Sequence, residues 1–145
     1  MAHLLPQNKI EGSDCAGFFE GDTTCTISPY FKIHDGKEQE FKENTKKFVE
    51  LTRNETDVVH FGFTYSDDGQ AHCREAYTSG KALLHHVKNV DGPLNNAMKL
   101  STLTRIEFHG PKSEIELVRE GLTPLGCIFF TADENCIKNK RIYKT

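Results

Sequence analysis

Between Pro29 and Glu134 the apolar residues of the chain switch repeatedly between the two-residue period of strands and the longer period of helices. The order that this pattern predicts is strand, helix, strand, strand, helix, strand, helix, strand. The two strands in the middle are joined by a tight turn at Asp68-Gly69. This order predicts an α+β fold of the ferredoxin-like, split βαβ type, with helices covering one face of an antiparallel sheet.

The bounds of the elements follow from the same pattern. Ser79 is the predicted N-cap of the second helix, and Asp91-Gly92-Pro93 is predicted to end that helix. We expect strands at residues 26–34, 57–65, 70–78, 100–109 and 127–131, and helices at residues 37–53, 80–90 and 111–122. Within the fourth of these strands, strict alternation places Leu103 on the face opposite Ile106 and Phe108.

The elements divide the 145 residues into one domain with two extensions. Residues 1–25 are rich in glycine and polar residues without a sustained period, which predicts an extended or mobile leader. Residues 26–133 form the predicted domain, and residues 134–145 form a polar C-terminal tail. A chain of this length is long enough for one self-standing core.

Charge and hydropathy exclude several classes of partner. The 18 basic and 21 acidic residues are spread along the chain, so no basic stripe predicts nucleic-acid binding. No apolar run is long enough to cross a bilayer, and the N-terminus does not resemble a secretory signal. Five cysteines without CxxC spacing are typical of free thiols, although a Cys15–Cys25 disulfide is an alternative. We therefore expect a cytoplasmic protein with no membrane association.

The sequence lacks the motifs that bind common cofactors. It has no dinucleotide-binding GxGxxG, no phosphate-binding GxxxxGK[ST] and no GxSxG, so no cofactor is predicted. Seven histidines are present, but none of their spacings matches a helical zinc site or a facial triad. No metal site is predicted either.

The second face of the predicted sheet is neither clearly polar nor clearly apolar. It carries residues such as His60, Thr64 and Arg105 together with apolar ones. A two-fold dimer buries two such faces at once, so we expect a homodimer.

Three segments resemble a known superfamily. They are PYFKIHDGKEQEFKENTKKFVELTRNE, VVHFGFTYSDDGQAHCREAYTSGKALLHHVKNV and LSTLTRIEFHGPKSEIELVREGLTPLG. The pattern comprises a turn at His34-Asp35-Gly36-Lys37, a hairpin leading into Arg74-Glu75-Ala76-Tyr77, and a helix that carries His85 and His86. Over residues 28–132 the chain is similar to the dimeric α+β-barrel proteins of the antibiotic biosynthesis monooxygenase-like superfamily.

The resemblance implies a pocket between the helices and the sheet of each subunit. Relatives of this kind include enzymes that oxidise polycyclic aromatics with oxygen and no cofactor, enzymes that degrade haem, and proteins of no established activity. Unlike many of them, this chain has no Trp. Structural roles remain an alternative for each of the candidate residues below.

Six residues are candidates for the pocket. His60 and His86 are the predicted catalytic residues, because imidazole can remove a proton from a phenolic substrate near neutral pH. Tyr65, Tyr77 and Arg105 can orient a phenolic or carboxylate ligand, and Phe63 is one of the phenylalanines expected to line the cavity.

Two functions remain open at this point. One is a cofactor-independent monooxygenase-like enzyme that acts on an aromatic or phenolic small molecule, in which the deprotonated substrate reacts with oxygen. The other is a non-catalytic homodimer that binds a small hydrophobic ligand.

Overall fold

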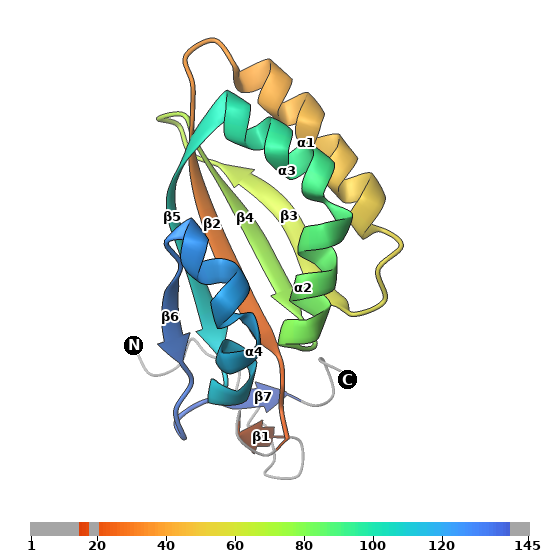
Figure 1. Ribbon diagram of the computed structural model, residues 1–145, viewed down its shortest axis with the longest axis vertical. Helices are drawn as coiled ribbons and strands as arrows, with labels where there is room; N and C mark the ends of the chain where they lie inside the picture. Colours follow the sequence, from red (N-terminus) through yellow and green to blue (C-terminus); the bar gives the residue numbers. More distant parts are fainter. Residues whose placement is uncertain (1–14, 18–20, 140–145) are drawn as a thin grey trace, which may run out of the picture.

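The computed structural model describes residues 15–17 and 21–139, and its main feature is a five-stranded sheet with all helices of the domain on one side (Figure 1). The strand order is β3-β4-β2-β5-β6. Four strands pair antiparallel, and β6 adds to the edge parallel to β5. The bounds are β2 Cys25–Ile33, β3 Val58–Tyr65, β4 Gln70–Tyr77, β5 Ser101–Gly110 and β6 Ile128–Thr131. The predicted ferredoxin-like α+β fold is thus confirmed.

The helices lie in two pairs over one face of the sheet, α1 beside α3 and α2 beside α4 (Figure 1). Ser79 caps α2 as predicted, because its hydroxyl accepts a hydrogen bond of 3.1 Å from the amide of Ala82. The bounds are α1 Glu38–Thr52, α2 Gly80–Asn89, α3 Asp91–Leu100 and α4 Lys112–Leu122, with a 3-10 turn, η1, at Thr123–Leu125.

The sequence analysis did not predict the helix α3. α2 ends at Asn89, before Asp91-Gly92-Pro93 as expected, but α3 starts directly at Asp91 and runs for ten residues. Pro93 lies in the first turn, where its missing N–H removes no helical hydrogen bond. The Leu94 amide then donates to the carbonyl of Val90 at 2.9 Å, which begins the hydrogen-bond ladder.

The hairpin between β3 and β4 agrees with the prediction. Gly69 has a φ of +82°, which only glycine adopts at little cost, and the Ser66 amide donates to the Gln70 carbonyl at 3.0 Å. The hairpin register pairs Phe63 with Cys73. Residues 61, 63, 73 and 75 therefore face the helices together.

A β-bulge in β5 overturns the predicted alternation of that strand. Tyr30 pairs with Arg105, whereas the next residue, Phe31, pairs with Leu103, so Thr104 is an extra residue in β5. Because of this insertion, Leu103 turns to the same side as Ile106. The bulge brings Leu103 into the covered face of the sheet, where it packs against both core clusters.

The hydrophobic core is divided into two clusters. The first joins α2 and α4 to β2 and β5, with Leu83, Val118 and Phe108 at its centre. The second joins α1 and α3 to the opposite end of the sheet, with Phe41 and Phe48 as its large members. The region between the two clusters is where a cavity forms.

The segments outside the domain meet in a second, two-stranded sheet. Its strands are β1 Cys15–Gly17 and β7 Ile137–Asn139, which pair antiparallel. Lys138, in β7, forms an ion pair of 3.0 Å with Asp22, and both side chains are buried. Cys25 is a free, buried thiol, while most of the predicted leader lies outside the described residues.

Candidate functional site

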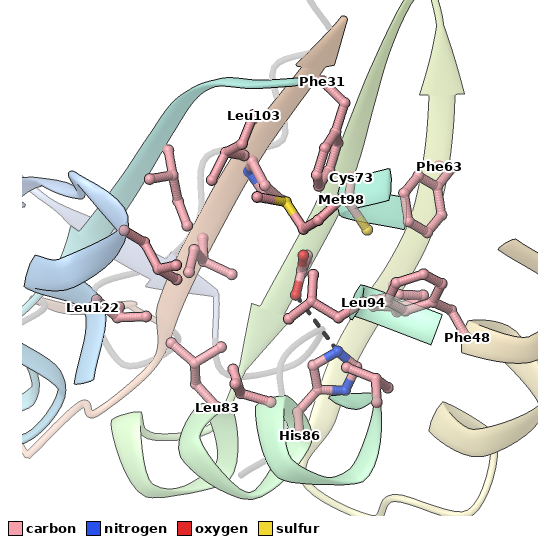
Figure 2. A pocket seen from close by; sticks show the side chains of 18 of the residues that line it. Phe31, Phe48, Phe63, Cys73, Leu83, His86, Leu94, Met98, Leu103 and Leu122 are labelled. Atoms are coloured by element: carbon pink, nitrogen blue, oxygen red, sulfur yellow. Dashed lines mark ion pairs between the residues drawn. The ribbon is translucent and has the colours of Figure 1, made fainter. Parts of the chain in front are cut away.

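A cavity of about 370 Å³ lies between the helices and the covered face of the sheet, at the boundary of the two core clusters (Figure 2). Phenylalanine, leucine, valine and isoleucine side chains make up most of its wall. The polar side chains in the wall are Glu75, His86 and Asn95, with the Cys73 thiol beside them. A cavity of this size and composition is typical of a site for a small apolar molecule.

Glu75 reaches the cavity because of the alternation of β4. Ala71, Cys73, Glu75 and Tyr77 occupy successive covered positions, and each is buried. The Tyr77 hydroxyl donates a hydrogen bond of 2.5 Å to Glu75 Oε2. Burial raises the pKa of the Glu75 carboxyl to about 7, although its hydrogen bonds with Tyr77 and Cys73 act in the opposite direction.

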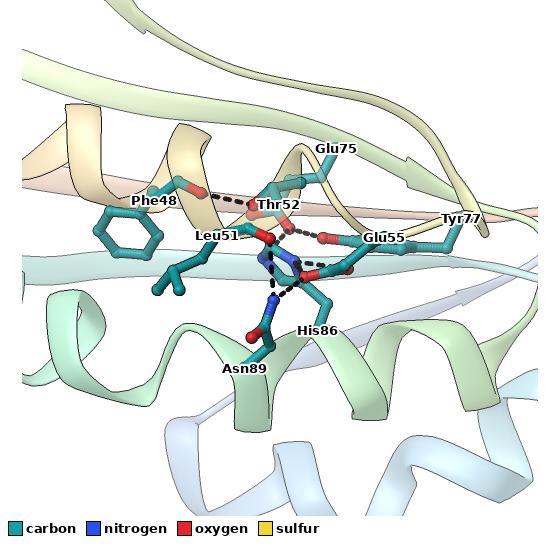
Figure 3. Close-up of polar contacts among 8 residues, drawn as sticks. All are labelled: Phe48, Leu51, Thr52, Glu55, Glu75, Tyr77, His86 and Asn89. Atoms are coloured by element: carbon teal, nitrogen blue, oxygen red, sulfur yellow. Dashed lines mark hydrogen bonds and ion pairs between the residues drawn. The ribbon is translucent and has the colours of Figure 1, made fainter.

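His86 faces Glu75 from α2, and Glu55 holds it from behind (Figure 3). His86 Nδ1 lies 3.0 Å from Glu55 Oε1, and the two side chains are only 3% and 5% exposed. Asn89, one turn further along α2, donates a hydrogen bond of 2.7 Å to the same oxygen. Glu55 is placed by the turn that ends α1, where its amide donates to the Thr52 carbonyl.

These contacts determine the tautomer of the neutral imidazole. An ionised carboxylate only accepts hydrogen bonds, so Nδ1 carries the proton toward Glu55. Nε2 then presents its lone pair toward Glu75, whose Oε2 lies 3.8 Å away, too far for a direct hydrogen bond. Burial lowers the pKa of His86, while the Glu55 carboxylate opposes that shift. Near neutral pH, close to the pKa of Glu75, the wall of the cavity therefore holds a partly protonated carboxyl beside an imidazole whose neutral form burial favours.

Glu55 also borders a second recess. This recess of about 340 Å³ is polar, and Asp57, Lys81 and His85 contribute to its wall. The cavity and the recess are thus connected through the chain Glu75, His86 and Glu55. Only the link between His86 and Glu55 is a hydrogen bond, so a proton can move along this chain when a water or a substrate hydroxyl bridges Glu75 and His86.

The structure places the six predicted site residues in different surroundings. His86 and Phe63 line the cavity, and Tyr77 lies behind Glu75. His60 is exposed on β3 and pairs with Ala76, on the face of the sheet away from the helices. Arg105 is on that face too, 2.9 Å from Glu107.

Tyr65 lies near the end of β3 and is 40% exposed. Its ring packs edge-on against Phe41, and Lys42 Nζ lies 4.9 Å from the ring centre. The cavity wall therefore includes two of the six residues, and a third contacts it through Glu75.

Glu55 and Glu75 were missed by the sequence analysis. For Glu75 a signal existed, because a carboxylate alternates there with Ala71, Cys73 and Tyr77 on a face that must be buried. Glu55 gave no such signal, since it follows a helix in a polar segment. Only the packing of α2 against the end of α1 brings it to His86.

Two other kinds of site are not found in residues 15–17 and 21–139. These residues contain no group of three or more His, Cys, Asp or Glu side chains arranged to hold a metal ion. No helix among them combines the length and the apolar character that a membrane crossing requires. The cytoplasmic location stays a prediction.

Comparison with known proteins gives matches at the level of structure. No protein-family model and no curated protein sequence matches the chain. The crystal structure of MupZ from Pseudomonas fluorescens is similar with a TM-score of 0.72 and 32% identity, covering 77% of this chain and 91% of MupZ.

Two further structures share the fold at lower identity. One is a Caulobacter crescentus protein assigned to the antibiotic biosynthesis monooxygenases, with 19% identity, a TM-score of 0.55 and coverage of 60% and 88% of the two chains. The other is a point mutant of SnoaB, a cofactor-independent oxygenase from Streptomyces nogalater, with 15% identity, a TM-score of 0.50 and coverage of 59% and 87%. MupZ is related to the chain across most of both sequences, so the chain belongs to the family of MupZ, and it shares the fold of the antibiotic biosynthesis monooxygenase-like proteins.

Proposed function

We propose that this protein is a cofactor-independent enzyme that transfers protons to and from a small, largely apolar molecule bound in the cavity. The observation that carries the proposal is the pair Glu75 and His86, side by side in an otherwise apolar wall. Pairs of titratable groups whose surroundings keep one protonated and the other unprotonated are typical of acid–base sites.

His86 is the base in this proposal. Nε2 takes a proton from a hydroxyl or an activated C–H group of the substrate, and the electron pair of that bond stays on the substrate. The imidazolium that forms is stabilised by Glu55, 3.0 Å from Nδ1. Glu55 is therefore a positioning residue that fixes the tautomer and the orientation of the ring.

Glu75 is the acid. In its protonated form it donates a proton to an oxygen of the substrate, and Tyr77 then stabilises the carboxylate that remains. The proton on His86 returns to Glu75 across the 3.8 Å between them, through a water or a substrate hydroxyl. Both groups are thereby restored, and a redox-neutral rearrangement needs no further reactant.

Deuterium exchange tests the proposal. The protein is incubated in D₂O with a panel of apolar ketones, phenols and hydroxyketones, and deuterium incorporation and product formation are followed by NMR and mass spectrometry. We expect Glu75→Gln and His86→Gln to reduce the rate by roughly 10²- to 10⁴-fold, the usual contribution of a general acid or base. His60→Gln, on the other face of the sheet, is the matched control. Exchange that is equally fast in Glu75→Gln contradicts the proposal.

A second candidate is a cofactor-independent monooxygenase, which the fold shared with an antibiotic biosynthesis monooxygenase favours. Here His86 deprotonates an aromatic or phenolic substrate, and the anion reacts with O₂. One oxygen atom enters the product as a carbonyl, the other leaves as water, and the substrate itself supplies the electrons. Oxygen uptake with candidate quinols that is lost in His86→Gln supports this function. Turnover of the same panel without oxygen contradicts the monooxygenase and supports the redox-neutral function.

We further propose that the face of the sheet opposite the helices forms a homodimer interface. The rings of Tyr30 and His72 lie in contact there, with their centres 4.5 Å apart and their planes tilted by 39°. Within the described residues His72 Nε2 is buried without a hydrogen-bond partner, which a second copy can supply. Light scattering at micromolar concentration should give twice the monomer mass. Ser28→Arg on the central strand should reduce it, whereas Glu50→Arg on α1 should not, and a monomeric wild type contradicts the interface.

A further inference from the structure

We propose that the cavity selects a neutral, elongated molecule with one oxygen function, which binds with this oxygen at Glu75 and His86 and with its apolar chain toward Met98 and Leu125. This inference deepens the proposed function and rests on it for the role of the polar end. It follows from the distribution of charge and of exposure around the cavity.

The charge of the wall excludes anions. Among the described residues no lysine or arginine lines the cavity, and its titratable side chains are Glu75, His86 and the Cys73 thiol. A carboxylate or phosphate in this space has no cation in the wall to pair with, and it meets Glu75 and, behind His86, the buried Glu55. Loss of hydration without a compensating partner makes this binding mode unfavourable.

The wall also disfavours a cation. Burial raises the pKa of the Glu75 carboxyl, so this side chain is substantially protonated near neutral pH and offers an O–H donor rather than a full negative charge. The Glu55 carboxylate is already engaged by His86 and Asn89. A neutral oxygen that accepts a hydrogen bond from Glu75, or a hydroxyl that also donates to His86, matches the groups present.

The exposure of the wall gives the orientation. Glu75 and His86 lie at the closed end and are 8% and 3% exposed. Met98 on α3 and Leu125 in η1 also line the cavity, yet they are 41% and 43% exposed, so they mark its mouth. A chain that leaves through this mouth keeps apolar contact along its length.

Three ligands of equal chain length test the charge selection. Decanol, decanoate and decylamine are titrated at about pH 6, below the pKa of Glu75, against the full-length protein loaded with the neutral fluorescent probe N-phenylnaphthylamine. We expect decanol to displace the probe with an affinity at least about tenfold higher than that of decanoate or decylamine. Tightest binding of decanoate or decylamine, or displacement by none of the three, overturns the proposal.

The ketone analogue decan-2-one tests the orientation, since its oxygen only accepts hydrogen bonds. Around Glu75 the titratable groups are Cys73 and Tyr77 on β4, His86 on α2 and Glu55 after α1. Of these, Glu75 loses its proton near neutral pH, so ketone affinity in the wild type should fall by about threefold or more between about pH 6 and pH 8.5. In Glu75→Gln, whose amide donates at every pH, the affinity should stay constant. An equal fall in both proteins overturns the orientation.

Two variants locate the binding site. Leu103→Trp fills the cavity and should abolish binding of decanol. Because that side chain is partly buried, Met98→Trp at the exposed mouth serves as a second test and should weaken binding by about tenfold. Leu117→Gln, on the exposed side of α4 and outside the cavity, is the matched control. Decanol binding that both tryptophan variants leave unchanged overturns the site.

The two proposals fail separately. Binding is measured without turnover, so selective decanol binding with no proton exchange refutes the proposed function and leaves the ligand class standing. Proton exchange on a charged substrate would support the proposed function and refute the proposed ligand class.

Discussion

Two faces of one sheet carry the same kinds of residue in different surroundings. On the covered face, Glu75 lies 3.8 Å from His86 with Glu55 behind it. On the open face, Glu107 lies 2.9 Å from Arg105 and 4.0 Å from His109. Both clusters combine carboxylate and imidazole, yet only the first lies against the cavity between helices and sheet.

Burial and the partner decide how each carboxyl titrates. On the open face the hydrogen bond from Arg105 holds the pKa of Glu107 below its usual range. On the covered face burial raises the pKa of Glu75 to about 7, and its hydrogen-bond donor is a neutral phenol rather than a guanidinium. The comparison teaches that a residue pair becomes an acid–base site through what surrounds it, not through its composition.

Glu75→Gln should give the largest effect on stability. The Glu75 pKa is raised from 4.5 to about 7, so the folded state binds more protons than the unfolded state between these values, and the wild type loses stability as the pH rises through this window. The full loss corresponds to about 3 kcal/mol. Glu75→Gln should therefore unfold at higher denaturant concentration than the wild type at about pH 8, with little difference at about pH 4.5. Equal stability differences at both values would contradict a buried, protonated Glu75.

Tyr77→Phe should have the next largest effect. The variant removes the donor to Glu75 from a fully buried position, which costs about 1 to 3 kcal/mol. The cost should be greater at about pH 8 than at about pH 5, because the hydroxyl favours the ionised carboxylate. Arg105→Gln removes the donor to Glu107 on the open face, and chemical denaturation should show a smaller change than for Tyr77→Phe, because solvent screens an exposed ion pair. Similar losses in the two variants would remove the distinction between the faces.

Glu55→Gln should act mainly on His86 and change stability by about 1 kcal/mol. The variant takes away the carboxylate that raises the His86 pKa, so nitrogen-15 NMR should show His86 titrating at lower pH than in the wild type. If the proposed function is correct, the low-pH limb of the pH–rate profile, where the base becomes protonated, moves with the pKa of His86. An unchanged His86 titration would show that Glu55 does not control the imidazole.

Glu107→Gln should have the smallest effect, within about 0.5 kcal/mol. Because the Glu107 pKa is lowered, its contribution is present above about pH 4.5 and is lost as the pH falls, opposite in direction to that of Glu75. Denaturation of this variant at several pH values checks the sign. A variant that becomes more stable than the wild type toward high pH would instead mean that Glu107 is buried by a partner copy.

The local elements were readable because they depend on neighbouring residues. The Asp68-Gly69 turn, the Ser79 cap and the amphipathic helices agree with the structure within one or two residues at their ends. Two features were not readable from local patterns: the bulge at Thr104, which turns Leu103 into the covered face, and the start of α3 at Asp91. Both depend on how β5 and α3 fit against elements distant in sequence.

The candidate site likewise combines features that the sequence predicts with features that only the tertiary structure shows. By itself the sequence determined that the chain is a ferredoxin-like α+β domain, that Phe63 faces its interior, and that His86 lies beside the apolar stripe of a helix. Only the tertiary structure decided that the core splits into two clusters around a cavity and that Glu55, Glu75 and His86 meet at its wall. The physical reason is that periodicity reports which face of an element is buried, whereas the pKa and contacts of a buried side chain depend on the elements packed against it.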